Sequence, residues 1–158
     1  MGRIVDEQVT SSTGVDFRAP RILVCDDSPD ERTALDLYLR ANGYETRTAS
    51  GGQMALDTLK EHEFDLILLD LHMPGTSGFD VLAYLQKHRR GLPVIIMSGL
   101  PADQIQTNIH ALPHHELPPL LLKPIDPDQL LPLMELILRE QLPDFETPPD
   151  VQSETEIK

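Results

Sequence analysis

Four short runs of consecutive apolar residues stand out along the chain, and none of them alternates with polar positions. They lie at residues 22–25, 66–69, 94–97 and 120–122. Such runs are expected in a parallel sheet whose two faces are both covered by helices, whereas a half-solvated antiparallel sheet would alternate. A fifth segment, residues 44–49, mixes polar and apolar positions and predicts an edge strand.

The segments between these runs carry apolar residues at helical spacing and open with helix-start signals. Ser28, Pro29 and Glu31 combine an N-cap, a proline at the first helical position and a capping-box glutamate. Ser50 and Gln53 repeat the box with a glutamine. The remaining N-cap candidates are Ser77 and Asp126. The runs are therefore separated by predicted helices.

Two of the helical segments fit the pattern poorly. The apolar stripe of Ile105, Ile109 and Leu112 is thin, and irregular structure is expected after about residue 112. Pro132 lies inside the last segment, where a proline costs about 3 kcal/mol, and it predicts a late helix start or a kink. Strand and helix nevertheless alternate along the chain, which predicts a doubly wound α/β fold with a five-stranded parallel sheet and helices on both faces.

The length of 158 residues fits one domain with short appendages. The α/β pattern occupies residues 20–141. Residues 1–19 lack the apolar core of a secretion signal and are rich in small polar residues, which predicts a flexible leader. Residues 142–158 combine acidic residues with prolines, which predicts a disordered tail.

The chain is acidic, since 26 Asp and Glu against 13 Lys and Arg give a net charge of -13. This excess opposes binding to nucleic-acid phosphates, so no direct nucleic-acid contact is expected. The single cysteine, Cys25, cannot form an internal disulfide, and no run approaches the ~18 apolar residues of a membrane span. These features predict a cytoplasmic protein without membrane contact.

The predicted strands end in residues capable of chemistry. These residues are Asp26, Asp27, Asp70, Ser98 and Lys123. The carboxyl ends of parallel strands converge on one crevice of an open α/β sheet, so the five side chains are expected to meet. Three crowded carboxylates repel by roughly 4 kcal/mol per pair at ~4 Å and an effective dielectric of ~20. Protonation of one acid or a bound Mg²⁺ would offset this repulsion, and the all-oxygen set favours the metal.

A carboxylate held beside Mg²⁺ can attack a phosphorus centre. Lys123 would then neutralise oxygens of the transferring group, and Ser98 would donate a hydrogen bond to one of them. The simpler explanation of the aspartates is helix capping and turn formation, because Asp is common at strand-to-helix junctions. The co-occurrence of Ser98 and Lys123 at strand ends favours the chemical role.

Four short motifs follow one another along the chain, each at the end of a predicted strand. They are Val-Cys-Asp-Asp-Ser at 24–28, Asp-Leu-His-Met-Pro-Gly-Thr-Ser-Gly at 70–78, Met-Ser-Gly at 97–99 and Lys-Pro at 123–124. Each motif is weak alone, whereas the four in this order are specific. Over residues 21–139 the chain thus resembles the receiver domain of two-component response regulators, the CheY-like superfamily. The resemblance implies the flavodoxin-like strand order 2-1-3-4-5.

The resemblance also implies a role for each residue at this edge of the sheet. Asp70 would be the phosphoacceptor, and Ser98 and Lys123 would contact the phosphoryl group. The Mg²⁺ ligands would be oxygen atoms of Asp26, Asp27, Asp70 and the backbone carbonyl of His72. The phosphoryl donor would be a phosphohistidine on a sensor histidine kinase or a phosphotransfer protein. Phosphorylation would switch binding to a downstream partner protein, which the sequence does not identify.

Two features depart from the family pattern. A Tyr or Phe usually stands three residues before the lysine and turns inward on phosphorylation, whereas this chain has Leu120 at that switch position. Residues 101–119 lack the small Gly-Ala stretch that the family usually shows before its last strand. We therefore expect atypical switching and an atypical output surface; whether the domain forms a homodimer is left open.

There are two alternatives to the phosphorylated switch. The first is a phosphorylation-independent adaptor that keeps the receiver fold, supported by Leu120 and the unusual segment before it. The second is a phosphatase with Asp70 as nucleophile. The phosphatase is disfavoured because His72 stands where a second acid would protonate a leaving group. Slow loss of the protein's own phosphoryl group is the only hydrolysis expected, so the chain is not predicted to be an enzyme.

Overall fold

Five parallel strands form one central sheet in the computed structural model, which describes residues 18–101, 103–105 and 118–145. The strands are β1 (Arg21–Cys25), β2 (Glu45–Ala49), β3 (Leu66–Asp70), β4 (Val94–Ser98) and β5 (Leu120–Leu122). They lie in the order β2-β1-β3-β4-β5, and every neighbouring pair is parallel. The predicted five-stranded sheet and its order 2-1-3-4-5 are confirmed.

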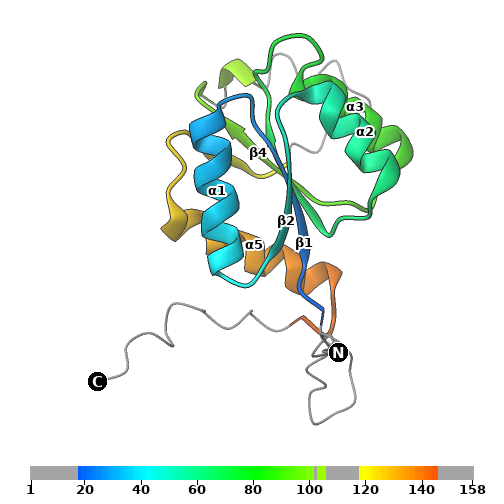
Figure 1. Cartoon of the computed structure of the whole chain (residues 1–158), viewed down its shortest axis with the longest axis vertical. Coiled ribbons are helices and arrows are strands. Elements are labelled where there is room, and N and C mark those ends of the chain that lie inside the picture. The colour runs from blue at the N-terminus through cyan, green and yellow to red at the C-terminus, as the bar shows by residue number, and fades with distance from the viewer. Residues whose placement is uncertain (1–17, 102, 106–117, 146–158) are drawn as a thin grey trace, which may run out of the picture.

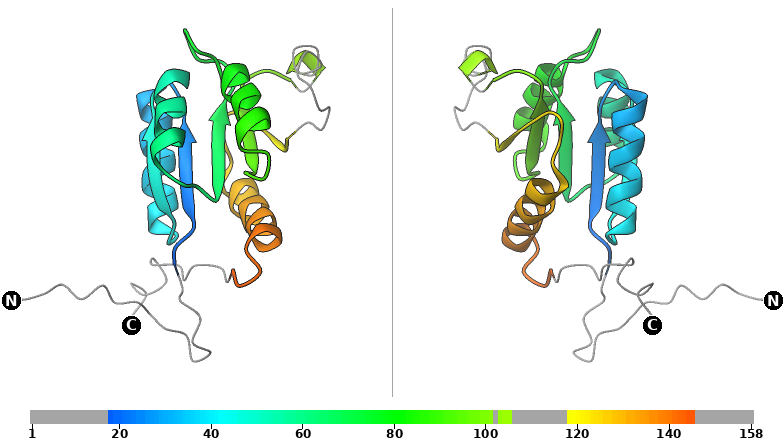
Figure 2. Two further views of the ribbon diagram at one scale, coloured as in Figure 1. Left: turned by 90° about the vertical axis from the view of Figure 1, so that its right-hand side faces the viewer. Right: turned by 90° about the vertical axis from the view of Figure 1, so that its left-hand side faces the viewer.

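Helices cover both faces of this sheet, as a doubly wound fold requires. They are α1 (Pro29–Ala41), α2 (Gly52–Glu61), α3 (Gly78–His88) and α5 (Pro127–Gln141). Figure 1 shows α1 and α5 on one side of the sheet and α2 and α3 on the other. The two views of Figure 2 look onto these two faces in turn. Each face has its own apolar core, formed by the strands and the two helices that cover it.

The strands differ in burial according to their place in the sheet. Every residue of β3 and β4 is buried, which explains why their sequences are continuously apolar. The mixed pattern of β2 matches its position at one edge, as predicted. The prediction of a buried last strand is wrong, because β5 forms the other edge and Leu122 is 54% exposed.

The first helix begins where the sequence predicts, but not through the full predicted capping box. Ser28 accepts a hydrogen bond at 3.4 Å from the backbone N–H of Glu31 and so caps α1. In a capping box the Glu31 side chain would bond the backbone N–H of Ser28. That N–H instead donates to Asp26 Oδ1 at 2.9 Å, and the Glu31 carboxylate bonds Lys123. The predicted capping box is therefore wrong, because the Glu31 side chain does not bond the backbone N–H of Ser28.

The second helix also departs from the prediction, because Gly51 and not Ser50 is its N-cap. The Ser50 hydroxyl donates to the sulfur of Met54, and the Gln53 side chain bonds Asp57. A side-chain cap is present where the sequence predicts one on the remaining helices. These caps are Ser77 on α3 and Asp126 on α5.

The last helix accommodates its internal proline. Helix α5 begins directly after Asp126, whose carboxylate accepts the backbone N–H of Asp128 at 2.9 Å. It continues through Pro132 to Gln141, so the predicted late start is wrong. Of the predicted irregular segment after residue 112, residues 113–117 lie outside the described residues, whereas residues 118 and 119 are described and belong to no helix or strand. Residues 1–17 of the predicted leader and residues 146–158 of the predicted tail also lie outside the described residues.

Contacts at both ends of the described chain tie it to the fold. Arg18 Nη1 lies 2.7 Å from Asp65 Oδ2, at the amino end of β3. Phe145 packs against the apolar core shared by α1 and α5. None of the helices within the described ranges is both long and apolar enough to cross a membrane.

Candidate functional site

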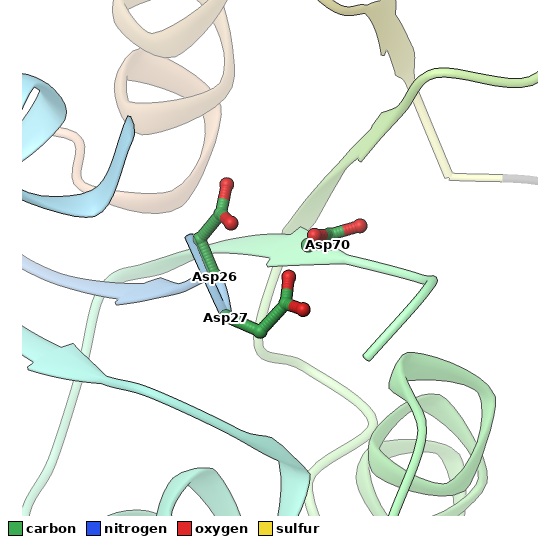
Figure 3. A group of neighbouring side chains, drawn as sticks. All are labelled: Asp26, Asp27 and Asp70. Carbon is green, nitrogen blue, oxygen red and sulfur yellow. The ribbon is translucent and has the colours of Figure 1, made fainter. Parts of the chain in front are cut away.

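Three aspartates meet at the carboxyl edge of the sheet. Asp26 and Asp27 directly follow β1, and Asp70 ends the adjacent strand β3. The ladder pairs Cys25 with Leu69, so Asp26 and Asp70 follow at the same level. One carboxylate oxygen of each aspartate lies within 4.8 Å of the others (Figure 3). Asp26 and Asp70 are buried, at 0% and 3% exposure, whereas Asp27 is exposed.

Backbone groups fix the two buried carboxylates in place. The N–H of Ser28 donates to Asp26 Oδ1 at 2.9 Å, and the N–H of His72 donates to Asp70 Oδ1 at 3.0 Å. The Arg32 side chain donates to the backbone carbonyl of Asp26 at 2.8 Å. The loop and helix starts after β1 and β3 therefore orient both acids before any ligand binds.

A glycine allows α3 to begin close to Asp70. A Cβ added to Gly78 would lie 2.3 Å from the carbonyl oxygen of Asp70 and 2.5 Å from Cα of Leu71. Both contacts are with backbone, which cannot move aside without shifting the strand. Gly78, the last residue of the motif at 70–78, thus lets the helix pack against the end of β3.

Lys123 follows β5 and reaches across the sheet edge to this cluster. Its Nζ lies 2.8 Å from Asp26 Oδ2 and 3.1 Å from Asp70 Oδ2. A third carboxylate, that of Glu31 on the first turn of α1, lies 2.7 Å from the same nitrogen. From the sequence, Glu31 is predicted only to cap the helix, and its contact with Lys123 is missed. The available signal was an acidic side chain one turn after Asp26 and Asp27, on the helix that starts at this edge.

The pKa values of Asp70 and Lys123 are both raised, but for different reasons. Burial raises the pKa of Asp70, and the nearby Asp26 charge adds to this, although hydrogen bonds from His72 and Lys123 oppose it. Burial would lower the pKa of Lys123, but hydrogen bonds to Asp26, Glu31 and Asp70 outweigh burial and raise it. Lys123 therefore stays an ammonium, while the ionised form of Asp70 is poorly compensated. A further cation beside Asp70 would be stabilising.

Of the other predicted site residues, Ser98 and His72 lie at this edge, whereas Leu120 lies at the start of β5. The buried Ser98 ends β4, where its hydroxyl accepts the backbone N–H of Leu100 at 3.0 Å. Its carbonyl accepts the N–H of Lys123 at 2.8 Å, which links the two strand ends. The His72 side chain is exposed and meets the ring of Phe79 edge-on. Leu120 begins β5 and packs, half-buried, against the core shared by α2 and α3.

The donor set of this cluster suits a hard divalent cation. The three aspartates offer only oxygen atoms, and two of them are buried and already oriented. Mg²⁺ prefers one or two carboxylates and completes its shell with water and phosphate oxygens. Asp26, Asp27 and Asp70 could therefore hold Mg²⁺.

Comparison with protein families agrees with this geometry. The family described as "Response regulator receiver domain" matches residues 22–135. Among curated proteins, the transcriptional regulatory protein ZraR of Escherichia coli O157:H7 is 34% identical over 128 residues, 80% of this chain and 28% of ZraR. The ZraR of Klebsiella oxytoca is 35% identical over 131 residues, 80% of this chain and 29% of that protein. The chain thus spans less than a third of the length of these relatives.

Solved structures give the same result. The CheY-like receiver domain protein of Methanospirillum hungatei is 25% identical, with a TM-score of 0.70 over 78% of this chain and 97% of that chain. The response regulator protein TrrA of Thermotoga maritima is 29% identical, with a TM-score of 0.65 over 75% of this chain and 98% of that chain. The TrrA structure was solved in complex with Mg²⁺-BeF.

Proposed function

The chain belongs to the response regulator receiver domain family, and on that premise we propose that it accepts a phosphoryl group on Asp70 in a Mg²⁺-dependent pocket. The observation that carries the proposal is the position of Asp70 itself. Its buried carboxylate lies within 4.8 Å of two other acids and 3.1 Å from the Lys123 ammonium. A nucleophile, a cation site and a fixed positive charge are the components that phosphoryl transfer requires.

The reaction begins with attack by a carboxylate oxygen of Asp70 on the phosphorus atom. A P–O bond to Asp70 forms while the bond to the donor's leaving atom breaks, and the leaving atom keeps the bonding electron pair. Asp26, Asp27, Asp70 and the backbone carbonyl of His72 would hold Mg²⁺, which would supply positive charge to the phosphoryl oxygens. Lys123 contributes a second positive charge, and the Ser98 hydroxyl donates to a phosphoryl oxygen.

The donor we propose is a phosphohistidine on a sensor histidine kinase or a phosphotransfer protein. Transfer from it breaks a P–N bond, and the imidazole nitrogen that keeps the electron pair then takes a proton from solvent. The family assignment supports such a donor, since receiver domains are typically phosphoaccepting signalling modules and not metabolic enzymes. The output is altered binding of a partner protein. Slow hydrolysis of the aspartyl phosphate would reset the state.

The alternative function is an adaptor that binds its partner without phosphorylation. The observation that favours it is Leu120, which stands half-buried in β5 at the switch position. A two-state change from 1:99 to 99:1 needs ~5.5 kcal/mol, whereas one charge-assisted hydrogen bond from Ser98 supplies about 1.5 to 3. Without an aromatic switch, phosphorylation would have weaker control over the binding of the partner protein.

The deciding experiment is intact mass spectrometry after incubation with acetyl phosphate, with and without Mg²⁺. We expect a single phosphoryl adduct on the wild-type chain with Mg²⁺, its loss in Asp70→Asn, and its retention in Asp57→Asn. Asp57 is the matched control because it is an exposed aspartate on α2 whose side chain bonds Gln53. Absence of an adduct under every condition would contradict the phosphoreceiver and favour the adaptor.

A further inference from the structure

Glu31 contributes a fourth carboxylate to the site without belonging to the aspartate cluster. It extends from the first turn of α1, and its Oε2 lies 2.7 Å from Lys123 Nζ, the shortest of the three contacts of that nitrogen. Among the residues that the structure describes, the acids close enough together to share a metal ion are Asp26, Asp27 and Asp70. Glu31 therefore contacts the lysine and not the three aspartates, so metal binding does not explain its position.

Three carboxylates use all three hydrogen-bond donors of the Lys123 ammonium group. A lysine ammonium has three N–H donors, and three carboxylates lie within 3.1 Å of Nζ. An incoming phosphoryl oxygen can accept a hydrogen bond from Lys123 only if one carboxylate gives up its place. The order in which the three acids can be displaced thus affects how readily the pocket receives a phosphoryl group.

The three acids differ in how firmly they are held. The side chains of Asp26 and Asp70 are 0% and 4% exposed, and each accepts a backbone N–H. The Glu31 side chain is 47% exposed and extends from a helix turn whose cap uses only the Glu31 backbone. Glu31 is the acid that can swing into solvent at least cost. While in place, it holds the ammonium toward α1 and adds negative charge beside the pocket.

We propose that Glu31 is a positioning residue that restrains Lys123 and lowers the affinity of the pocket for small anionic phosphoryl donors. The proposal rests on the proposed phosphoreceiver function and deepens it. Two effects act in the same direction: Glu31 competes with a phosphoryl oxygen for a lysine donor, and its charge repels an anion that approaches Asp70. Removal of the carboxylate therefore makes the pocket more receptive to acetyl phosphate.

The test compares Glu31→Gln with Asp30→Asn in the full chain. Both variants remove one carboxylate charge from the first turn of α1, and neither removes the Ser28 cap. Asp30 is exposed, whereas Glu31 contacts Lys123. A general loss of negative charge would affect both variants alike, so a difference between them isolates the contact with Lys123.

Two measurements are made on each variant. The first is the ¹⁵Nζ signal of Lys123 by NMR, without Mg²⁺ or phosphoryl donor, which reports how firmly the ammonium is held. The second is the initial rate of adduct formation against acetyl phosphate concentration at saturating Mg²⁺, which separates the half-saturating concentration from the maximal rate. We expect Glu31→Gln to shift and broaden the Lys123 signal and to lower the half-saturating concentration by about threefold to tenfold. Asp30→Asn should match the wild type in the NMR signal and stay within about twofold in rate.

The outcomes separate this inference from the function on which it rests. Equal behaviour of Glu31→Gln and Asp30→Asn, with a normal adduct on the wild type, overturns the role of Glu31 alone. An effect of Glu31→Gln confined to the maximal rate also contradicts it, because restraint of the lysine acts on donor binding. A wild-type chain that forms no adduct refutes the phosphoreceiver function, and the NMR comparison then still tests the Glu31–Lys123 contact.

Discussion

Two aspartates at opposite ends of strand β3 experience opposite environments. Asp65, just before the strand, accepts two hydrogen bonds from the Arg18 guanidinium at 2.7 and 2.8 Å and one from the Arg21 backbone N–H at 2.7 Å. Burial would raise the pKa of Asp65, but these bonds outweigh burial and lower it. Asp70, at the other end, has its pKa raised, chiefly by burial.

The difference lies in how the cations are shared. Asp65 has the guanidinium of Arg18 bound through both of its oxygens, which satisfies the charge of that acid. Asp70 shares the single ammonium of Lys123 with Asp26 and Glu31. An acid with its own cation stabilises the fold, whereas an acid that shares one keeps the capacity to bind a further cation. This contrast gives three predictions, in decreasing order of effect.

The largest effect is expected from Lys123→Met, which removes the only cation that, in the described part of the chain, bonds the carboxylates of Asp26 and Asp70. Breaking a buried ion pair typically costs 3–5 kcal/mol, and we expect the free energy of unfolding to fall by about 3 kcal/mol in EDTA. Excess Mg²⁺ should recover part of the loss, because it supplies a replacement charge. Urea unfolding with and without Mg²⁺, with the exposed Lys60→Met as control, measures both effects. A loss that Mg²⁺ does not reduce would contradict a shared cation site.

Asp65→Asn should come next, with a loss of about 1 to 2 kcal/mol in the free energy of unfolding at neutral pH. The half-exposed Arg18 limits the gain from the ion pair, and the amide oxygen of the variant can still accept a hydrogen bond. The variant nevertheless loses the paired, charge-assisted bonds to both nitrogens of the Arg18 guanidinium. Urea unfolding should show the same loss in EDTA and in Mg²⁺. Dependence of the loss on Mg²⁺ would contradict the separation of the two ends of the strand.

The pH dependence of this variant provides its internal control. Because folding lowers the pKa of Asp65 below its ordinary value of 3.8, the stabilisation is fully present above that value. It is lost as the pH falls through the lower, folded pKa. The difference between wild type and Asp65→Asn should therefore be constant from pH 7 to about 5 and shrink below about 4. A difference that grows on acidification would show that the sign of the shift is wrong.

The smallest effect is expected from Asp70→Asn, and its sign is opposite. Folding disfavours the ionised form of Asp70, chiefly through burial, so a neutral side chain should raise the free energy of unfolding in EDTA by about 1 kcal/mol. The gain stays small because the weakened Lys123 contact offsets most of the relieved cost of burying the charge. Mg²⁺ should stabilise the wild type, by about 1.4 kcal/mol at ten times its dissociation constant, and stabilise the variant less. Thermal unfolding across a Mg²⁺ titration measures both. Destabilisation in EDTA like that of Asp65→Asn would remove the contrast between the two acids.

The fold was predictable because its strands are marked locally. Buried on both faces, β3 and β4 are continuously apolar, and the mixed β2 is recognisable as an edge. The edge position of β5 was not predictable from Leu120–Leu122, since an apolar run looks the same whether or not its outer side is covered. Capping was predicted correctly for Ser77. It failed for Glu31, whose carboxylate bonds a distant lysine, and for Ser50 and Gln53, whose side chains bond residues of the helix itself.

The sequence by itself determined which residues gather at the functional edge. Parallel strands bring their carboxyl ends together, so a chain that places Asp26, Asp70 and Lys123 directly after strands must place them side by side. Only the tertiary structure decided how the charges are divided among them. Glu31 bonds a lysine 92 residues away, and Asp65 captures the guanidinium of Arg18. These pairings depend on distances across the folded sheet, which no local spacing in the chain encodes.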